Sequence, residues 1–223
     1  MNGYLKKENM AKISINESPR EKNDRIAEGN RKRLEDFRVL NMIGSPGAGK
    51  TSILEKTAEL LGRKLAVIEG DVQTDLDAER ITRYGTSAVQ IETGGACHLN
   101  AEQVGNALDS LELEGVKVII IENVGNLVCP SAFDLGEDAK VAVVSLPEGD
   151  EKPLKYPNLF MRSKAVIVNK IDLAGILEYD ISRVRKDCTR LNSKARIFEL
   201  SAKTGEGMEE WISYLTEDLQ EKF

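Results

Sequence analysis

The sequence predicts an α/β fold in which helices flank a mostly parallel β-sheet. Three observations predict it. Short apolar runs alternate with amphipathic helical segments from Arg38 onward. The run 116–121 is nearly continuous and β-branched, which is typical of a strand that helices bury on both faces. A glycine-rich loop of the phosphate-binding type joins the first apolar run to a helical segment.

The predicted strands follow one another in order along the chain. The apolar runs are 39–43, 65–68, 116–121, 141–145, 165–168 and a short one near 196–199. Because helical segments separate these runs, we expect right-handed βαβ units. The last helical segment carries Met208, Trp211, Ile212, Leu215 and Leu219 at helical spacing, a stripe typical of core packing.

The composition of the chain argues against binding to nucleic acid or to a membrane surface. The chain has 223 residues and a formal net charge of −6, whereas a non-specific binder of nucleic acid or of a membrane surface is usually basic. We therefore expect neither kind of partner. No stretch approaches the apolar length of a membrane span and no charged-then-apolar leader is present, so the cytoplasm is the expected location. Its 3 cysteines are too few for a disulfide framework.

The strongest motif is the glycine-rich loop at residues 44–51, Gly-Ser-Pro-Gly-Ala-Gly-Lys-Thr, which is typical of P-loop NTPases. Its glycines let successive N–H groups face one phosphate, and the following helix adds the positive end of its dipole. Lys50 brings a full charge to the β- and γ-phosphates, and the Thr51 hydroxyl can ligate Mg²⁺. The nucleotide contacts predicted here are Gly44, Ser45, Gly47, Ala48, Gly49, Lys50, Thr51 and Ser52.

A second motif predicts that the base is guanine. Asn169, Lys170 and Asp172 directly follow the run 165–168, so they lie at the carboxyl edge of the sheet, where ligands of such folds bind. The Asp172 carboxylate can accept two hydrogen bonds from guanine, whereas adenine would leave it unpaired. The Lys170 stem can lie along the base. After the last strand, backbone N–H groups can reach the guanine oxygen from Ser201, Ala202 and Lys203. Together these motifs resemble the GTPase superfamily.

Acidic residues at two other strand ends predict the magnesium site. Glu122 ends the run 116–121 and can hold Mg²⁺ through water, while Gly125 can approach the γ-phosphate. Asp71 and Asp75 follow the run 65–68. We predict Thr51, Asp75 and Glu122 for Mg²⁺, and Lys50, Asp71 and Asp75 for catalysis. Because no Gln occupies an obvious water-positioning place, we expect slow intrinsic hydrolysis.

A third group of residues is suited to a softer metal ion. Cys97 and the single histidine, His98, are adjacent, and Cys129 follows on the loop that leaves the Glu122 strand. Thiolate and imidazole suit Zn²⁺, Ni²⁺ or copper. Three ligands are one short of a closed tetrahedral site, and a second chain across a two-fold axis would supply more. Spacing alone leaves a second interpretation open, in which the cysteines are buried and His98 is an ordinary surface group. We expect Cys188 to serve packing.

Several segments together resemble the HypB family of nickel-incorporation GTPases. They are residues 44–51, 69–71, 92–99, 122–130 and 151–157. The resemblance runs from about Arg38 onward and implies a GTPase fold of the SIMIBI type. It implies a metal-responsive GTPase that forms a GTP-dependent homodimer and helps load nickel into nickel–iron hydrogenase. It further implies Cys97, His98 and Cys129 as metal ligands at the dimer interface, with another maturation protein and the hydrogenase large subunit as partners.

The chain departs from that family in its N-terminal extension. Residues 1–37 contain neither Cys nor His, whereas many members carry a cysteine motif or His-rich tract there. We divide the chain into this extension and a GTPase domain at 38–223. A helix is expected from Ser18-Pro19, a favourable cap and first position, with Ile26, Ala27 and Leu34 as its apolar stripe.

A second departure is Ser45, which stands where related ATPases carry a signature lysine. Two alternatives to a hydrogenase nickel GTPase stay open. One is a related metallochaperone GTPase of the urease or cobalamin-enzyme type. The other is a non-catalytic switch, in which GTP binding alone controls a partner.

Overall fold

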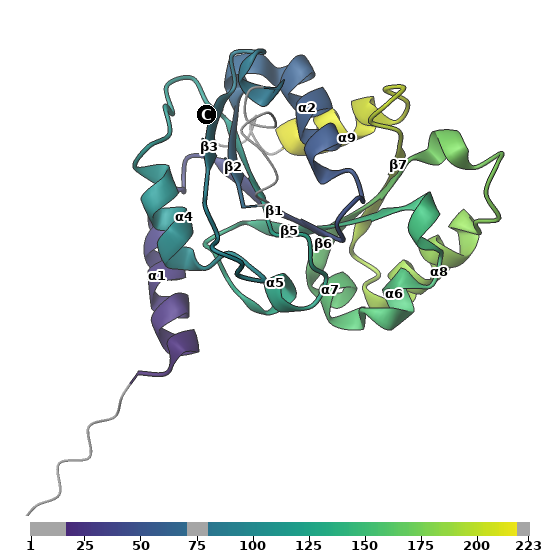
Figure 1. Cartoon of the computed structure of the whole chain (residues 1–223), viewed down its shortest axis with the longest axis horizontal. Coiled ribbons are helices and arrows are strands. Elements are labelled where there is room, and N and C mark those ends of the chain that lie inside the picture. Colours follow the sequence, from purple (N-terminus) through teal and green to yellow (C-terminus); the bar gives the residue numbers. More distant parts are fainter. Residues whose placement is uncertain (1–16, 71–79, 218–223) are drawn as a thin grey trace, which may run out of the picture.

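The centre of the molecule is a parallel sheet of seven strands, in a computed structural model that describes residues 17–70 and 80–217 (Figure 1). The strands are β1 (Arg38–Gly44), β2 (Leu65–Glu69), β3 (Ser87–Gln90), β4 (Val118–Glu122), β5 (Ala139–Ser145), β6 (Ser163–Asn169) and β7 (Arg196–Leu200). Their order across the sheet is β3-β2-β4-β1-β5-β6-β7, with every neighbouring pair parallel. The strand that feeds the phosphate-binding loop, β1, is therefore central and lies beside β4.

Helices cover both faces of the sheet. The α-helices are α1 (Pro19–Arg33), α2 (Lys50–Leu61), α4 (Ala101–Leu108), α5 (Cys129–Ala132), α6 (Lys152–Lys155), α7 (Pro157–Arg162), α8 (Ile181–Leu191) and α9 (Met208–Thr216). Short 3-10 turns lie at Gly62–Lys64, Leu146–Glu148 and Ile171–Leu173. Helices α2 and α9 bury one face, and α4, α7 and α8 pack on the other. Alternate residues of each strand point to opposite faces, and helices cover both faces, so the central strands β1 and β4 are mostly apolar, with Asn41 and Glu122 as buried polar exceptions.

All six predicted strands are present, and the sheet also contains one strand that was not predicted. The run 116–121 becomes a strand only at Val118. The additional strand, β3, has the sequence Ser-Ala-Val-Gln and lies half-buried at the edge of the sheet. A short, partly polar edge strand has no pattern that would distinguish it from a loop. In the last helix, Met208, Trp211 and Leu215 are buried as expected, and Leu219 lies outside the described residues.

The predicted N-terminal helix forms and packs on the nucleotide-binding fold. Ser18 caps α1 by accepting a hydrogen bond from the Glu21 N–H, and Glu21 in return accepts one from the Ser18 N–H. Ala27 and Leu34 are buried as expected. The helix runs beside α4 (Figure 1), and the two are in contact. None of the described helices combines the length and apolar character needed to cross a bilayer.

Candidate functional site

The phosphate-binding loop brings a cation, a hydroxyl and a carboxylate to one point. It leaves the carboxyl end of β1, and α2 begins at Lys50. The Lys50 Nζ lies 3.8 Å from Oε1 of Glu122, the last residue of β4, and both side chains are almost fully buried. The Thr51 hydroxyl donates to the same Glu122 oxygen over 3.0 Å. Three of the residues predicted for phosphate and Mg²⁺, namely Lys50, Thr51 and Glu122, therefore meet where two adjacent strands end.

Asn169 ties the base-recognition loop to the phosphate-binding loop. Its side-chain amide donates to the Ala48 carbonyl over 2.9 Å and accepts from the N–H groups of Lys170 (2.8 Å) and Ala202 (3.2 Å). The Lys170 ammonium reaches the Gly47 carbonyl over 2.7 Å. Lys170 has a φ of 64°, an unusual backbone conformation for a non-glycine residue. Three loops that are distant in sequence thus share one set of hydrogen bonds.

Two further contacts shape the same region. The Ser201 hydroxyl donates to Asp172 Oδ1 over 2.6 Å, which sets the orientation of the carboxylate predicted to bind guanine. Gly49 has a φ of 91°, and a Cβ atom there would lie 2.4 Å from the Asn169 amide nitrogen, so only glycine fits. Ser52 and Lys203, also predicted contacts, line a neighbouring cavity of about 450 Å³.

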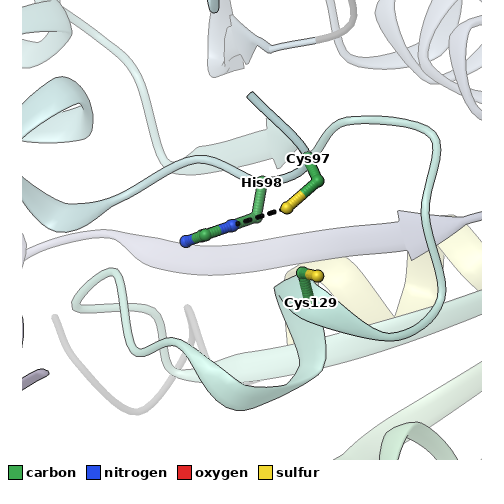
Figure 2. Close-up of side chains that lie close together, drawn as sticks. All are labelled: Cys97, His98 and Cys129. Carbon is green, nitrogen blue, oxygen red and sulfur yellow. Dashed lines mark hydrogen bonds between the residues drawn. The ribbon is translucent and has the colours of Figure 1, made fainter. Parts of the chain in front are cut away.

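Cys97, His98 and Cys129 lie together. The first two lie on the loop between β3 and α4, and Cys129 is the first residue of α5. One donor atom from each residue lies within 4.8 Å of the other two (Figure 2). The Cys97 Sγ points at His98 Nδ1 over 3.4 Å, and Cys129 lies opposite them. Cys97 is exposed and Cys129 half-buried, so core packing does not account for the cluster, whereas Cys188 is buried as predicted.

The ionisation of these groups follows from their surroundings. A hydrogen bond with the Cys129 sulfur raises the pKa of the Cys97 thiol above its ordinary value. Burial lowers the pKa of His98, because desolvation disfavours the imidazolium form. The imidazole is therefore neutral at pH 7, the form that binds metal ions. A tetrahedral zinc site with these ligands has donor atoms roughly 3.5–4 Å apart, so the donor set fits a metal ion with small movements.

Residues that the sequence did not single out hold the two loops of this cluster against each other. The His98 ring stacks on Phe133, with 3.9 Å between ring centroids. The Asn126 side-chain amide donates to the Cys97 carbonyl over 3.1 Å. Asn126 lies in a recognisable motif, but neither its contact nor that of Phe133 follows from sequence spacing.

Asn123 connects the nucleotide side to the cysteine–histidine cluster. It directly follows Glu122, and its buried Oδ1 accepts from the Leu99 N–H, one residue after His98, over 3.1 Å. Its Nδ2 donates to Asn41 of β1 over 3.1 Å. Gly125 lies on the same loop, between Glu122 and Cys129. Asp71 and Asp75, the remaining predicted site residues, lie outside the described residues.

The family model that matches the chain is described as the CobW/HypB/UreG nucleotide-binding domain and covers residues 38–199. Hydrogenase maturation factor HypB of Azotobacter vinelandii is 52% identical over 199 residues, which are 87% of this chain and 65% of that protein. The chain thus spans less than two thirds of that relative's length. The hydrogenase/urease maturation factor HypB of Helicobacter pylori strain 26695 is 42% identical over 217 residues, covering 95% of this chain and 90% of that protein.

Among solved structures, HypB from Helicobacter pylori in complex with nickel superposes with a TM-score of 0.84. It is 41% identical, and the match covers 91% of this chain and 97% of that one. The likeness therefore includes almost the whole fold described above.

Proposed function

Since the chain belongs to the CobW/HypB/UreG family of nucleotide-binding domains, we propose that it is a metal-binding GTPase that assists nickel insertion during hydrogenase maturation. The reaction is the hydrolysis of GTP by water to GDP and phosphate. One observation carries the proposal. Cys129 lies on the loop that leaves Glu122, the carboxylate that contacts the phosphate-binding loop, and the Cys97–His98 loop is bonded through the Leu99 N–H to Asn123, the residue after Glu122. A change at the phosphates therefore has a short path to the metal ligands.

The phosphate side of the reaction rests on Lys50, which would neutralise charge on the β- and γ-phosphates. Magnesium suits this site, because the Thr51 hydroxyl and the Glu122 carboxylate offer adjacent oxygen ligands of the kind it prefers. When bound, Mg²⁺ would offset the charge that develops during phosphoryl transfer. Asp75 remains our candidate for contacting Mg²⁺ or orienting water, and Asp71, four residues earlier, remains a second candidate for catalysis. We expect slow hydrolysis.

Guanine specificity rests on Asp172, whose carboxylate would accept from two donors that adenine lacks. The Ser201 contact supports this role, since it orients the carboxylate before the base arrives. The hydrogen bonds of Asn169 keep the base loop and the phosphate loop at a constant separation. A nucleotide that spans both loops then meets a preformed site.

The cargo proposed for Cys97, His98 and Cys129 is nickel, with zinc as the alternative, because thiolate and imidazole ligands suit both. Three protein ligands leave a coordination position open, which a second copy of the chain or an acceptor protein can fill. We therefore propose a GTP-dependent homodimer in the cytoplasm, with another maturation protein and the hydrogenase large subunit as partners. The nickel complex of the Helicobacter pylori relative supports the choice of metal.

An alternative target is urease. The Helicobacter pylori relative is named as a hydrogenase/urease maturation factor, so the family's targets are not restricted to one enzyme. A non-catalytic switch is the other alternative. GTP turnover measured by phosphate release separates it from a GTPase.

The deciding experiment titrates Ni²⁺ into the protein bound to GDP and to a non-hydrolysable GTP analogue. We expect the two nickel affinities to differ by a factor of about 5 to about 150, the usual range for coupled sites. Cys129→Ala should abolish the difference. Cys188→Ala is the matched control, because it removes a buried thiol of α8 that is not part of the cluster, and it should preserve the difference. Equal affinities in the wild-type protein would contradict nucleotide-controlled metal delivery.

A further inference from the structure

Helix α1 contacts both segments that carry the metal ligands. We propose that α1 is a strap whose two buried amides, Asn23 and Asn30, set the separation of the Cys97–His98 loop from the Cys129 loop. The two asparagines are positioning residues and do not themselves bind the metal. The functional part of this inference rests on the proposed metal site, while the geometric part stands independently of it.

Asn23 joins two segments that are far apart in sequence. Its Oδ1 accepts from the Ala101 N–H over 2.9 Å, and its Nδ2 donates to the Asp134 carbonyl over 2.9 Å. Ala101 is the first residue of α4, three residues after His98. Asp134 follows Cys129 by five residues. One side chain thus links a point beside one half of the cluster to a point beside the other.

Asn30 makes a second bridge between the same two segments. Its Nδ2 donates to the Ala101 carbonyl over 2.8 Å and to the Leu135 carbonyl over 3.1 Å. Asn30 lies seven residues after Asn23, which is about two helical turns, so both amides emerge from one face of α1. Their residues are 6% and 3% exposed. The N–H and the carbonyl of Ala101 are each bound to a different amide of the strap.

The backbone around the strap is shaped for close approach. Gly136 has a φ of 97°, and a Cβ atom there would lie 2.8 Å from the Ala27 carbonyl oxygen. On the other side, a Cβ atom at Gly105 of α4 would lie 3.0 Å from Asn30 Oδ1. The Arg31 guanidinium also donates to both carboxylate oxygens of Asp134, over 2.8 and 2.7 Å. Helix α1 therefore packs closely against α4 on one side and against residues 134–136 on the other.

Hydrogen bonds set this separation more tightly than apolar contacts would. They weaken steeply when their angle or length changes, whereas apolar contacts are non-directional. The partners at Ala101 and Leu135 are buried backbone groups and the Asp134 carbonyl is half-buried; leaving a buried group without a partner costs about 1–3 kcal/mol. The two ligand-bearing loops are thus held at one spacing before a metal ion arrives. Preorganisation of this kind raises affinity, because less freedom is lost on binding.

The test uses Asn23→Asp, which keeps the oxygen that accepts from Ala101 but removes the donor to Asp134. It therefore cuts the bridge with no change of side-chain size. Asn30→Ala removes the second bridge. Arg33→Ala is the control, because the hydrogen bonds that Arg33 makes within residues 17–70 and 80–217 go to α4 and the residue after it, at Gly105 and Asp109. All variants are made in the full chain.

The first measurement reports loop spacing without any metal ion. Phenylarsine oxide condenses with two thiols to form two As–S bonds and release one water, so its affinity depends on how closely Cys97 and Cys129 are held together. Cys188 is buried in α8, and the other two thiols of the chain are those of the cluster. We expect about tenfold weaker chelation in Asn23→Asp and Asn30→Ala, and wild-type chelation in Arg33→Ala. Ni²⁺ affinity, measured against a competing chelator, should fall in parallel, while the affinity for a fluorescent GDP analogue should stay within about twofold.

If both asparagine variants bind phenylarsine oxide with wild-type affinity, the strap hypothesis is wrong, regardless of the change in Ni²⁺ affinity. Equal weakening in Arg33→Ala would also overturn it, because the effect would then come from docking of α1 in general. Weaker arsenical binding with parallel loss of nickel affinity supports both the strap and the metal site. Weaker arsenical binding in a protein whose wild type binds no nickel supports the strap and refutes the proposed metal site.

Discussion

Asn169→Ala tests whether one side chain holds the nucleotide loops together. The Asn169 amide is buried and satisfies the Ala48 carbonyl and the Ala202 N–H, which belong to the phosphate loop and to the loop after β7. Alanine would leave both backbone groups without this partner. In the nucleotide-free variant the two loops can relax toward water, and nucleotide binding then has to restore the bound arrangement.

The expected loss of nucleotide affinity is calculated from the two backbone groups that lose their hydrogen-bond partner. Each buried polar group that loses its partner costs about 1–3 kcal/mol. We take the lower part of the sum, about 2–4 kcal/mol, because both loops are partly accessible to water. At about 1.4 kcal/mol per tenfold change in affinity, GDP and GTP should bind from about 30-fold to about 1,000-fold more weakly.

The assay is titration with a fluorescent GDP analogue, competed with unlabelled GTP. Asn192→Ala is a matched control, because Asn192 donates to the Ser163 carbonyl at the opposite end of β6, far from the nucleotide loops. It should bind nucleotide normally. An Asn169→Ala protein whose GDP affinity lies within threefold of wild type would refute the reasoning that this amide organises the site.

Three further outcomes are expected. Asp172→Asn should weaken GTP binding and strengthen binding of xanthine nucleotides, measured by competition, because the donor–acceptor pair is inverted; unchanged preference would move the base site elsewhere. Lys50→Ala should abolish phosphate release and sharply weaken nucleotide binding, and wild-type turnover would show that the phosphate loop is misassigned. Partial burial opposes ionisation of Asp134, but hydrogen bonds from the Gly136 N–H and Arg31 outweigh it and lower its pKa. Its contribution to stability is therefore complete above the ordinary aspartate pKa of about 3.9 and is lost as the pH falls through the lower folded value. Melting temperatures from pH 7 to pH 3 should fall more steeply for wild type than for Asp134→Asn, and parallel curves would contradict this.

Predictions about the central strands were accurate because a strand that is buried on both faces needs apolar residues at nearly every position, and such a run is recognisable in the sequence. Residues 39–43 are apolar except for Asn41, residues 141–144 are apolar without interruption, and both runs lie within β1 and β5. The edge strand β3 was missed because it is short and half-buried, so it needs little apolar character. The helix after Ser18-Pro19 was predicted from its cap, which depends only on residues within one turn. The partners of its buried amides were not predictable, since they lie more than 70 residues away in sequence.

The sequence by itself determined the chemistry available to this protein. A phosphate-binding loop and a guanine motif are short contiguous patterns, and their backbone geometry follows from local glycines and from the strands that precede them. It also placed Cys97 beside His98. Sequence reasoning also grouped Cys129 with them and Glu122 with Thr51 as candidates, but only the tertiary structure gives the contacts themselves and the place of α1 across both ligand-bearing loops. Those relations depend on the order of strands in the sheet and on hydrogen bonds between distant segments. Long-range pairing of this kind is decided by the packing of the whole chain, because no local pattern specifies which distant group a buried amide will meet.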